Sequence, residues 1–160
     1  MDGWNDLFVA TAGTASVLAG LIFVGLSINL DKLVAMSSVL LRAAAALALL
    51  VGVLGISILM LIPEQSLRNA GIEVTGVAVA IGGIVVLLSE RSVRRTSEEF
   101  RGNAIALSGL RIAALVPLFA SGILLIGNHS TGLDLLVPSF LMAFVVTIVE
   151  AWVVLVEIVR

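Results

Sequence analysis

The sequence predicts an all-α integral membrane protein, a polytopic bundle of about five transmembrane helices with almost no soluble part. Hydrophobic residues make up 60% of the 160 residues and charged residues make up 12%, whereas a soluble domain carries about 25% charged residues. The mean hydropathy is +1.20. The core of one short soluble domain cannot bury so much apolar surface, so lipid must be the solvent. Residues 1–160 therefore form a single transmembrane helical domain in this prediction.

Charged residues mark where each predicted span begins and ends, because a helix needs about 17 to 25 mostly apolar residues to cross the hydrocarbon layer. Five stretches satisfy this condition: residues 7–30, 39–62, 72–89, 103–126 and 135–156. Pro63 stops the second stretch, and the third is the shortest, with Glu73 in its first turn. Residues 90–102 are the only sizeable polar segment and are predicted to form a cytoplasmic loop.

The basic residues predict the orientation in the membrane, since short cytoplasmic loops are enriched in Lys and Arg. An odd number of spans places the two termini on opposite sides. If the N-terminus is outside, only Arg68 lies on the outer side, and Arg111 lies within the membrane. The inner side then holds the other basic residues: Lys32, Arg42, Arg91, Arg94, Arg95, Arg101 and Arg160. This bias predicts an outer N-terminus and an inner C-terminus.

The residue inventory argues against an enzyme, a metal site or a cofactor. The chain has no cysteine and a single histidine, His129, so neither a thiolate or His-based metal site nor a serine triad can be assembled. No phosphate-binding or dinucleotide-binding glycine motif is present. The net charge is -2 and the basic residues form no stripe, which argues against a nucleic-acid partner. We expect a non-enzymatic protein surrounded by the lipid bilayer.

Small residues recur in the first three predicted helices, and helices in lipid associate through the close packing that small residues permit. In the first helix Ala12, Ser16 and Gly20 are spaced by four, which places them on one face. The second and third helices offer further packing candidates: Gly52, Gly55, Gly76, Gly82 and Gly83. These faces are either ordinary contacts inside one bundle or an interface between subunits of a homo-oligomer. Five helices leave little interior for a solute, so transport would need several copies.

Two ionisable residues, Arg111 and Glu150, lie inside predicted spans, where a charge is costly and usually faces a partner or a water-filled cavity. Arg111 follows Arg101 by ten residues and Glu150 precedes Arg160 by ten. Both therefore lie about 15 Å from the inner boundary at about 1.5 Å per residue. Their helices are consecutive, joined by a short turn and so antiparallel neighbours. The sequence predicts a charge pair at this depth.

Each of these charges shares a helix face with a hydroxyl three residues earlier, Ser108 before Arg111 and Thr147 before Glu150. The two hydroxyls are expected to support the pair. Three interpretations remain open for it. The pair orients two helices, or Glu150 is a proton-linked or ion-linked site, or Arg111 extends to the inner interface as a long side chain can.

The run FVATAGTASVLAGLIFVGLSINLDKL at residues 8–33, with Arg42 and the alanine-rich stretch that follows, resembles a group of small actinobacterial membrane proteins. Some of these proteins carry the label of modulators of the membrane-bound FtsH protease. The resemblance covers about the first third of the chain. It implies a protein of the bacterial plasma membrane that acts on a partner, and it maps no catalytic motif onto this sequence.

Two hypotheses about function follow. The first is an accessory or regulatory protein that acts through helix–helix contacts with a membrane partner, which the missing catalytic residues and the small-residue faces favour. The alternative is a homo-oligomeric ion channel or small-solute transporter in which Arg111 and Glu150 contribute to the pathway.

Overall fold

The computed structural model describes residues 3–28, 37–96 and 98–159. These residues form five helices: α1 (Asn5–Ile28), α3 (Ser37–Leu59), α4 (Leu67–Arg95), α5 (Glu98–Ile126) and α6 (Thr131–Val159). Each helix is long and apolar enough to cross a membrane. The predicted all-α class with five candidate spans is thereby confirmed, and the chain is a multi-pass membrane protein.

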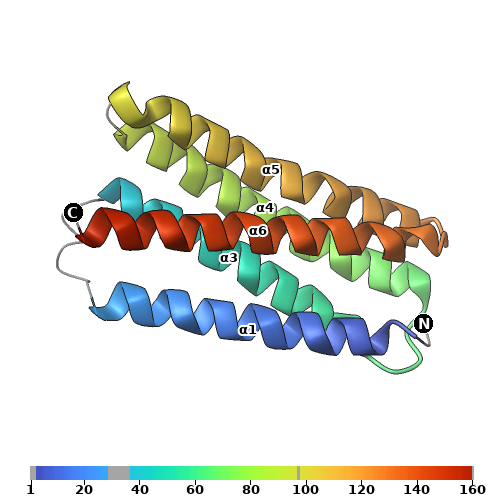
Figure 1. Cartoon of the computed structure of the whole chain (residues 1–160). Helices are drawn as coiled ribbons and strands as arrows, with labels where there is room; N and C mark the ends of the chain where they lie inside the picture. Colours follow the sequence, from blue (N-terminus) through green and yellow to red (C-terminus); the bar gives the residue numbers. More distant parts are fainter. Residues whose placement is uncertain (1–2, 29–36, 97, 160) are drawn as a thin grey trace.

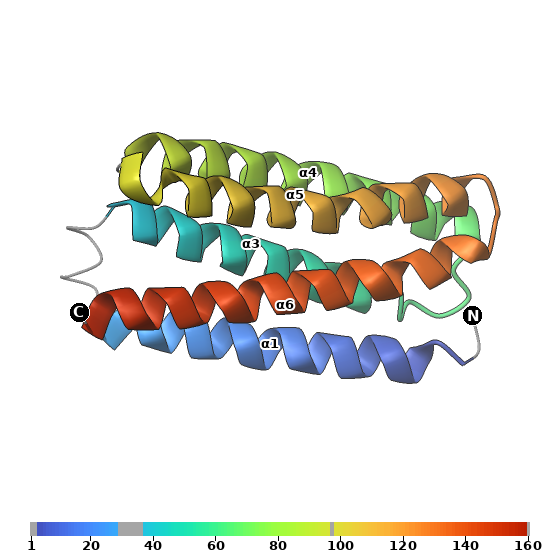
Figure 2. The same cartoon turned by 45° about the horizontal axis from the view of Figure 1, so that its top comes forward.

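The helices lie side by side as an elongated bundle, with α3 at its centre (Figure 1). α3 packs against α1, α4 and α6, and α5 packs against α4 and α6. In both views α4 and α5 lie together on one side, while α1 lies on the opposite side (Figure 2). α1 packs against α3 and, less extensively, against α6. Its apolar window is the least buried of the five candidate spans, at 17%.

The ends of α4 and α5 correct the predicted boundaries. α4 begins at Leu67 and ends at Arg95, so the span predicted as the shortest is a helix of 29 residues. Its start is fixed by Ser66, whose hydroxyl accepts a hydrogen bond from the Asn69 backbone amide at 3.3 Å. Most of the segment predicted as a loop at 90–102 is helical, because α4 continues to Arg95 and α5 begins at Glu98. Charged residues end the apolar layer but are compatible with a helix, so both helices continue beyond it.

The face of α1 that packs against the bundle is shifted by one residue relative to the predicted face. Phe8, Thr11 and Ala15 are buried, whereas Ala12 is half-buried and Ser16 and Gly20 are exposed. A Cβ atom added at Gly20 would have no atom within 4 Å. The predicted small-residue groove therefore does not pack against another described helix of the same chain.

A pair of hydroxyl groups fixes this rotation of α1. The Thr11 hydroxyl donates to the Phe8 carbonyl at 3.1 Å and lies 2.8 Å from the Ser57 hydroxyl of α3. Ser57 is fully buried. Hydrogen bonds between membrane helices contribute about 0.6 to 2 kcal/mol. Rotating α1 to bury Ser16 and Gly20 would break this contact, so Thr11 and Ala15 pack inward instead.

α4 and α5 approach each other closely at two glycines. A Cβ atom on Gly71 would lie 2.8 Å from the backbone carbonyl carbon of Leu125, and one on Gly122 would lie 3.2 Å from the backbone nitrogen of Thr75. Real Cβ atoms essentially never lie within 3.0 Å of another atom, so the contact at Gly71 requires glycine, and the 3.2 Å distance at Gly122 leaves little room for a side chain. The sequence interpretation did not single out either residue.

The predicted packing glycines of α3 and α4 divide into two groups. Gly52 lies against Ile81, and Gly82 lies against Phe119, with distances of 3.1 and 3.5 Å from an added Cβ atom. The others have no atom within 4 Å of that position: Gly55, Gly76 and Gly83. Spacing alone therefore does not identify which small residues lie at a helix contact.

Candidate functional site: a buried arginine–glutamate–arginine cluster

Three charged side chains from three helices meet inside the bundle. Arg42 comes from α3, Arg111 from α5 and Glu150 from α6. Glu150 is fully buried, Arg111 is 1% exposed, and the Arg42 side chain is 11% exposed. α3 and α6 are in direct contact, and so are α5 and α6. Glu150 therefore lies where α6 meets both of its neighbours.

The Glu150 carboxylate accepts a hydrogen bond from each arginine. Arg42 donates from Nε to one carboxylate oxygen at 3.1 Å. Arg111 donates from Nη2 to the other oxygen in a short contact. Hydrogen bonds between ionised groups are stronger than those between neutral groups. The structure thus brings Arg111 and Glu150 together, at the place where their matched depth predicted a pair.

Arg111 also reaches α4. Its Nη1 donates to the Ser89 hydroxyl at 3.1 Å, and Ser89 is buried. Arg111 Nε has no hydrogen-bond partner among the described residues. The guanidinium group thereby joins α4, α5 and α6. Because it is held by these two contacts, Arg111 does not extend to the inner interface as one interpretation had it.

The two hydroxyls expected to support the pair do not do so. Ser108 is buried, but the serine that Arg111 contacts is Ser89. Thr147 is 1% exposed, and its Oγ1 has no hydrogen-bond partner among the described residues. The spacing of three places each hydroxyl near its charge along one helix. The hydrogen-bond partner of each charge depends instead on which helix packs beside it, and the residue pattern along one helix does not show this.

The third member of the cluster, Arg42, was not predicted to lie there. It was assigned to the inner side of the membrane, together with Lys32 and Arg160, which lie outside the described residues. The helix bounds in the structure account for the contact. Arg42 lies five residues into α3 and Glu150 nine residues before the end of α6. These positions put the two backbones at depths of about 8 and 14 Å, within reach of a long arginine side chain.

The cluster acts as a brace between helices that apolar packing alone holds weakly, because lipid supplies no hydrophobic drive for helix association. Removing one member of a buried charge group costs about 3 to 5 kcal/mol, since the remaining charge loses its partner. Within the described residues no group of three or more His, Cys, Asp or Glu side chains could hold a metal ion. The hydrogen bonds of the cluster link α3, α4, α5 and α6.

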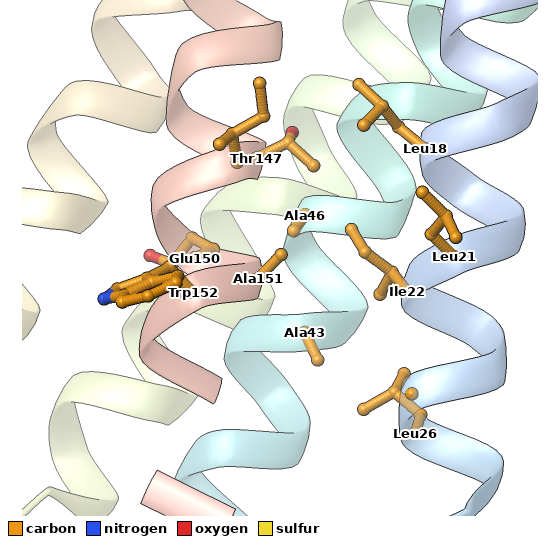
Figure 3. A pocket seen from close by; sticks show the side chains of 12 residues that line it. Leu18, Leu21, Ile22, Leu26, Ala43, Ala46, Thr147, Glu150, Ala151 and Trp152 are labelled. Carbon is orange, nitrogen blue, oxygen red and sulfur yellow. The ribbon is translucent and has the colours of Figure 1, made fainter. Parts of the chain in front are cut away.

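An apolar groove lies beside the cluster, between α1, α3 and α6. Its volume is about 390 Å³. The lining is mostly aliphatic: Leu18, Leu21, Ile22, Gly25, Leu26, Ala43, Ala46, Thr147, Ile148, Glu150, Ala151 and Trp152. Figure 3 shows the Thr147 side chain directed toward α3 and α1, and Glu150 directed away from α1. The Thr147 hydroxyl oxygen is itself buried, and the Glu150 carboxylate faces the arginines.

Comparison with protein families, curated proteins and solved structures finds no match to this chain. The fold and the site define a class of protein, a multi-pass helical bundle braced by buried charges. Its function has to be argued from that geometry.

Proposed function

We propose that this chain is a non-enzymatic accessory protein of the bacterial plasma membrane, which packs the outer face of α1 against a transmembrane helix of a membrane partner. The outer face is defined by three exposed small residues of α1: Gly13, Ser16 and Gly20. The observation that carries the proposal is that this face is uncovered and lies opposite the face that packs on α3.

The exposed small residues give the outer face its binding chemistry. Added Cβ atoms at Gly13 and Gly20 would meet no atom within 4 Å. The hydroxyl of Ser16 is already satisfied by the Ala12 carbonyl at 2.9 Å, so it needs no water. Another helix backbone can approach such a surface closely, which strengthens van der Waals contact and weak hydrogen bonds in lipid. The resemblance to modulators of a membrane protease agrees with this use of the face.

The channel alternative receives less support from the same geometry. A conducting pathway needs charges that face a water-filled space. Arg111 and Glu150 are 1% and 0% exposed, and each is bonded to the other. Opening a path past them in a single chain would require breaking the brace between α5 and α6. We therefore assign the pair to the stability of the bundle.

Site-specific photocrosslinking tests the outer face. A photoreactive amino acid at Gly20 is expected to give a protein adduct in native membranes, because a partner helix covers that position. Gly20→Leu should abolish co-purification of the same partner. Val116, exposed on α5, is the matched control and should give lipid adducts only. Identical adducts at Gly20 and Val116 would contradict the proposal, and a dimer of this chain would identify a second copy as the partner.

The proposed orientation, with the N-terminus outside, is tested by thiol labelling on the cysteine-free background. Ser130 lies in the turn between α5 and α6, and Arg95 ends α4 at the opposite end of the bundle (Figure 1). Both are exposed. A membrane-impermeant thiol reagent on intact cells should label Ser130→Cys and spare Arg95→Cys, because basic loops stay inside. The reverse labelling would invert the topology.

A further inference from the structure

A second apolar groove lies between α4 and α5, and no other helix contributes to its lining. Its volume is about 510 Å³. The lining residues are all apolar: Gly82, Gly83, Val86, Leu87, Ile112, Leu115, Val116 and Phe119. Leu87 and Val116 are 55% and 63% exposed. The α4–α5 groove is therefore open to the hydrocarbon chains of the surrounding bilayer.

Two arginines lie at one end of the α4–α5 groove, Arg94 on α4 and Arg101 on α5. Arg94 follows Leu87 by seven residues, and Arg101 precedes Ile112 by eleven. These spacings are about two and three helical turns, so each arginine lies on the same helix face as a groove residue. The two guanidinium groups therefore border the same side of the α4–α5 pair.

The level of these arginines along the bundle is that of the phospholipid phosphates. Gly122 of α5 meets Thr75 of α4 toward the other end of the pair. Counted from this contact, the Arg94 and Arg101 backbones lie about 29 and 32 Å along their helices. Arg94 also lies about 32 Å from Glu73, the charged residue at the other end of the α4 span. The hydrocarbon layer is about 30 Å thick, so both arginines lie at its boundary with the headgroups.

Two carboxylates on the same helix faces balance the two arginines. Glu90 follows Gly83 by seven residues, and Glu98 precedes Val116 by eighteen, which is five turns. All four charged residues are exposed, and none of them forms a salt bridge with another described residue. Arginine is well suited to binding a phosphate, but a headgroup of net negative charge would also be repelled by both carboxylates. The site therefore suits a phosphate headgroup with no net charge.

Glu98 indicates which uncharged headgroup fits. It lies three residues before Arg101, about 4 to 5 Å farther out along α5. In an ethanolamine headgroup the ammonium follows the phosphate by a two-carbon link and carries N–H donors, which a carboxylate accepts in strong hydrogen bonds. The quaternary ammonium of a choline headgroup has no such donor.

We propose that the α4–α5 groove binds phosphatidylethanolamine, with an acyl chain along the groove, its phosphate between Arg94 and Arg101, and its ammonium at Glu98. The arginines donate hydrogen bonds to the phosphate, and the Glu98 carboxylate accepts from the ammonium. The site uses no residue of α1, so it is independent of the partner contact proposed for that helix.

Binding is measured with phosphatidylethanolamine that carries bromines on its acyl chains, because bromine quenches tryptophan fluorescence on contact. Leu87→Trp places a reporter in the groove, in a background where the two native tryptophans are removed as Trp4→Phe and Trp152→Phe. In an uncharged maltoside detergent we expect saturable quenching. Brominated phosphatidylcholine and phosphatidylglycerol should each bind about threefold more weakly, the range of an exposed ion pair.

Charge variants test the headgroup contacts. Arg94→Gln and Arg101→Gln should each weaken phosphatidylethanolamine binding about fivefold, the equivalent of about 1 kcal/mol. Arg95→Gln is the matched control, because Arg95 is also exposed but lies about 100° around α4 from its neighbour. It should stay within about twofold of the parent. Glu98→Gln should abolish the preference for ethanolamine over choline.

A pair of glycine variants tests whether the acyl chain lies in the groove. Gly83 lines the groove, whereas Gly13 is exposed on α1 at the opposite side of the bundle (Figure 2). An added Cβ atom meets no atom within 4 Å at either position. Gly83→Leu should weaken binding severalfold by filling the groove, and Gly13→Leu should leave it unchanged. Both variants should unfold at the temperature of the parent, so a loss of binding does not reflect a loss of structure.

Three results would overturn the proposal. The first is tighter binding of phosphatidylglycerol than of phosphatidylethanolamine. The second is an equal loss in Arg94→Gln and Arg95→Gln, which would show diffuse attraction in place of a site. The third is a protein adduct from a photoreactive amino acid at Val116, because it would show that a helix of another chain occupies the groove.

Discussion

Glu150→Leu is expected to lower the free energy of unfolding by about 3 to 5 kcal/mol. The substitution removes the acceptor that Arg42 and Arg111 share, so both guanidinium groups lose a buried partner. Insertion scales put a charge at the centre of a membrane helix at about 2.5 to 3.5 kcal/mol, which is the same order. Steric-trap or thermal unfolding of the purified protein in detergent measures the difference in unfolding free energy between the parent and the variant.

Double variants show whether the loss comes from the pairing. Arg111→Leu alone should also be strongly destabilising. Arg111→Leu combined with Glu150→Leu should recover part of the loss, because neither residue is then left as a buried charge without the other. Glu98→Leu, at the exposed start of α5, is the matched control and should change stability by less than about 0.5 kcal/mol. Strictly additive losses at Arg111 and Glu150 would show that the two side chains do not interact.

Gly71→Ala is expected to have the second large effect, a loss of about 1 to 3 kcal/mol or more. The new methyl group would lie 2.8 Å from the carbonyl carbon of Leu125, and backbone cannot yield as a flexible side chain does. α4 and α5 must therefore separate at this end of the bundle. The unfolding midpoint and the exchange of amide hydrogens in both helices measure the change.

Gly76→Ala is the matched control for this prediction, because it lies in the same helix five residues later and has open space around the added methyl. Alanine favours a helix over glycine by up to about 1 kcal/mol, so this variant should be neutral or more stable. If Gly71→Ala and Gly76→Ala shift stability equally, the close approach of α4 and α5 is not a feature of the folded protein.

The number of helices could be predicted from the sequence, but their ends could not. Each span is visible because about 20 apolar residues stand between charges, and the bilayer imposes that length. The same charges do not stop a helix, as α4 shows by continuing through Glu90, Arg91, Arg94 and Arg95. The hydropathy pattern therefore locates the apolar layer, whereas the helix ends depend on caps such as Ser66.

The candidate site was predictable only in part for a similar reason. Arg111 and Glu150 lie on consecutive helices, so their depths could be compared along the chain. Arg42 lies 108 residues from Glu150 and meets it through the packing of α3 on α6, which no local pattern encodes. On α1 the spacing of four holds for Thr11 and Ala15 as well as for Ala12 and Ser16. The hydroxyl of Ser57 on α3 decides between these faces.

Ion flux through reconstituted liposomes tests most directly whether the buried cluster is a brace in an accessory protein and not part of a pathway. The purified protein is placed in liposomes that contain a pH-sensitive dye, and a potassium gradient with an ionophore supplies the driving force. We expect the proton flux to equal that of protein-free liposomes, for the parent and for Glu150→Gln alike. Flux above that level in the parent, lost in a folded Glu150→Gln variant, would contradict it.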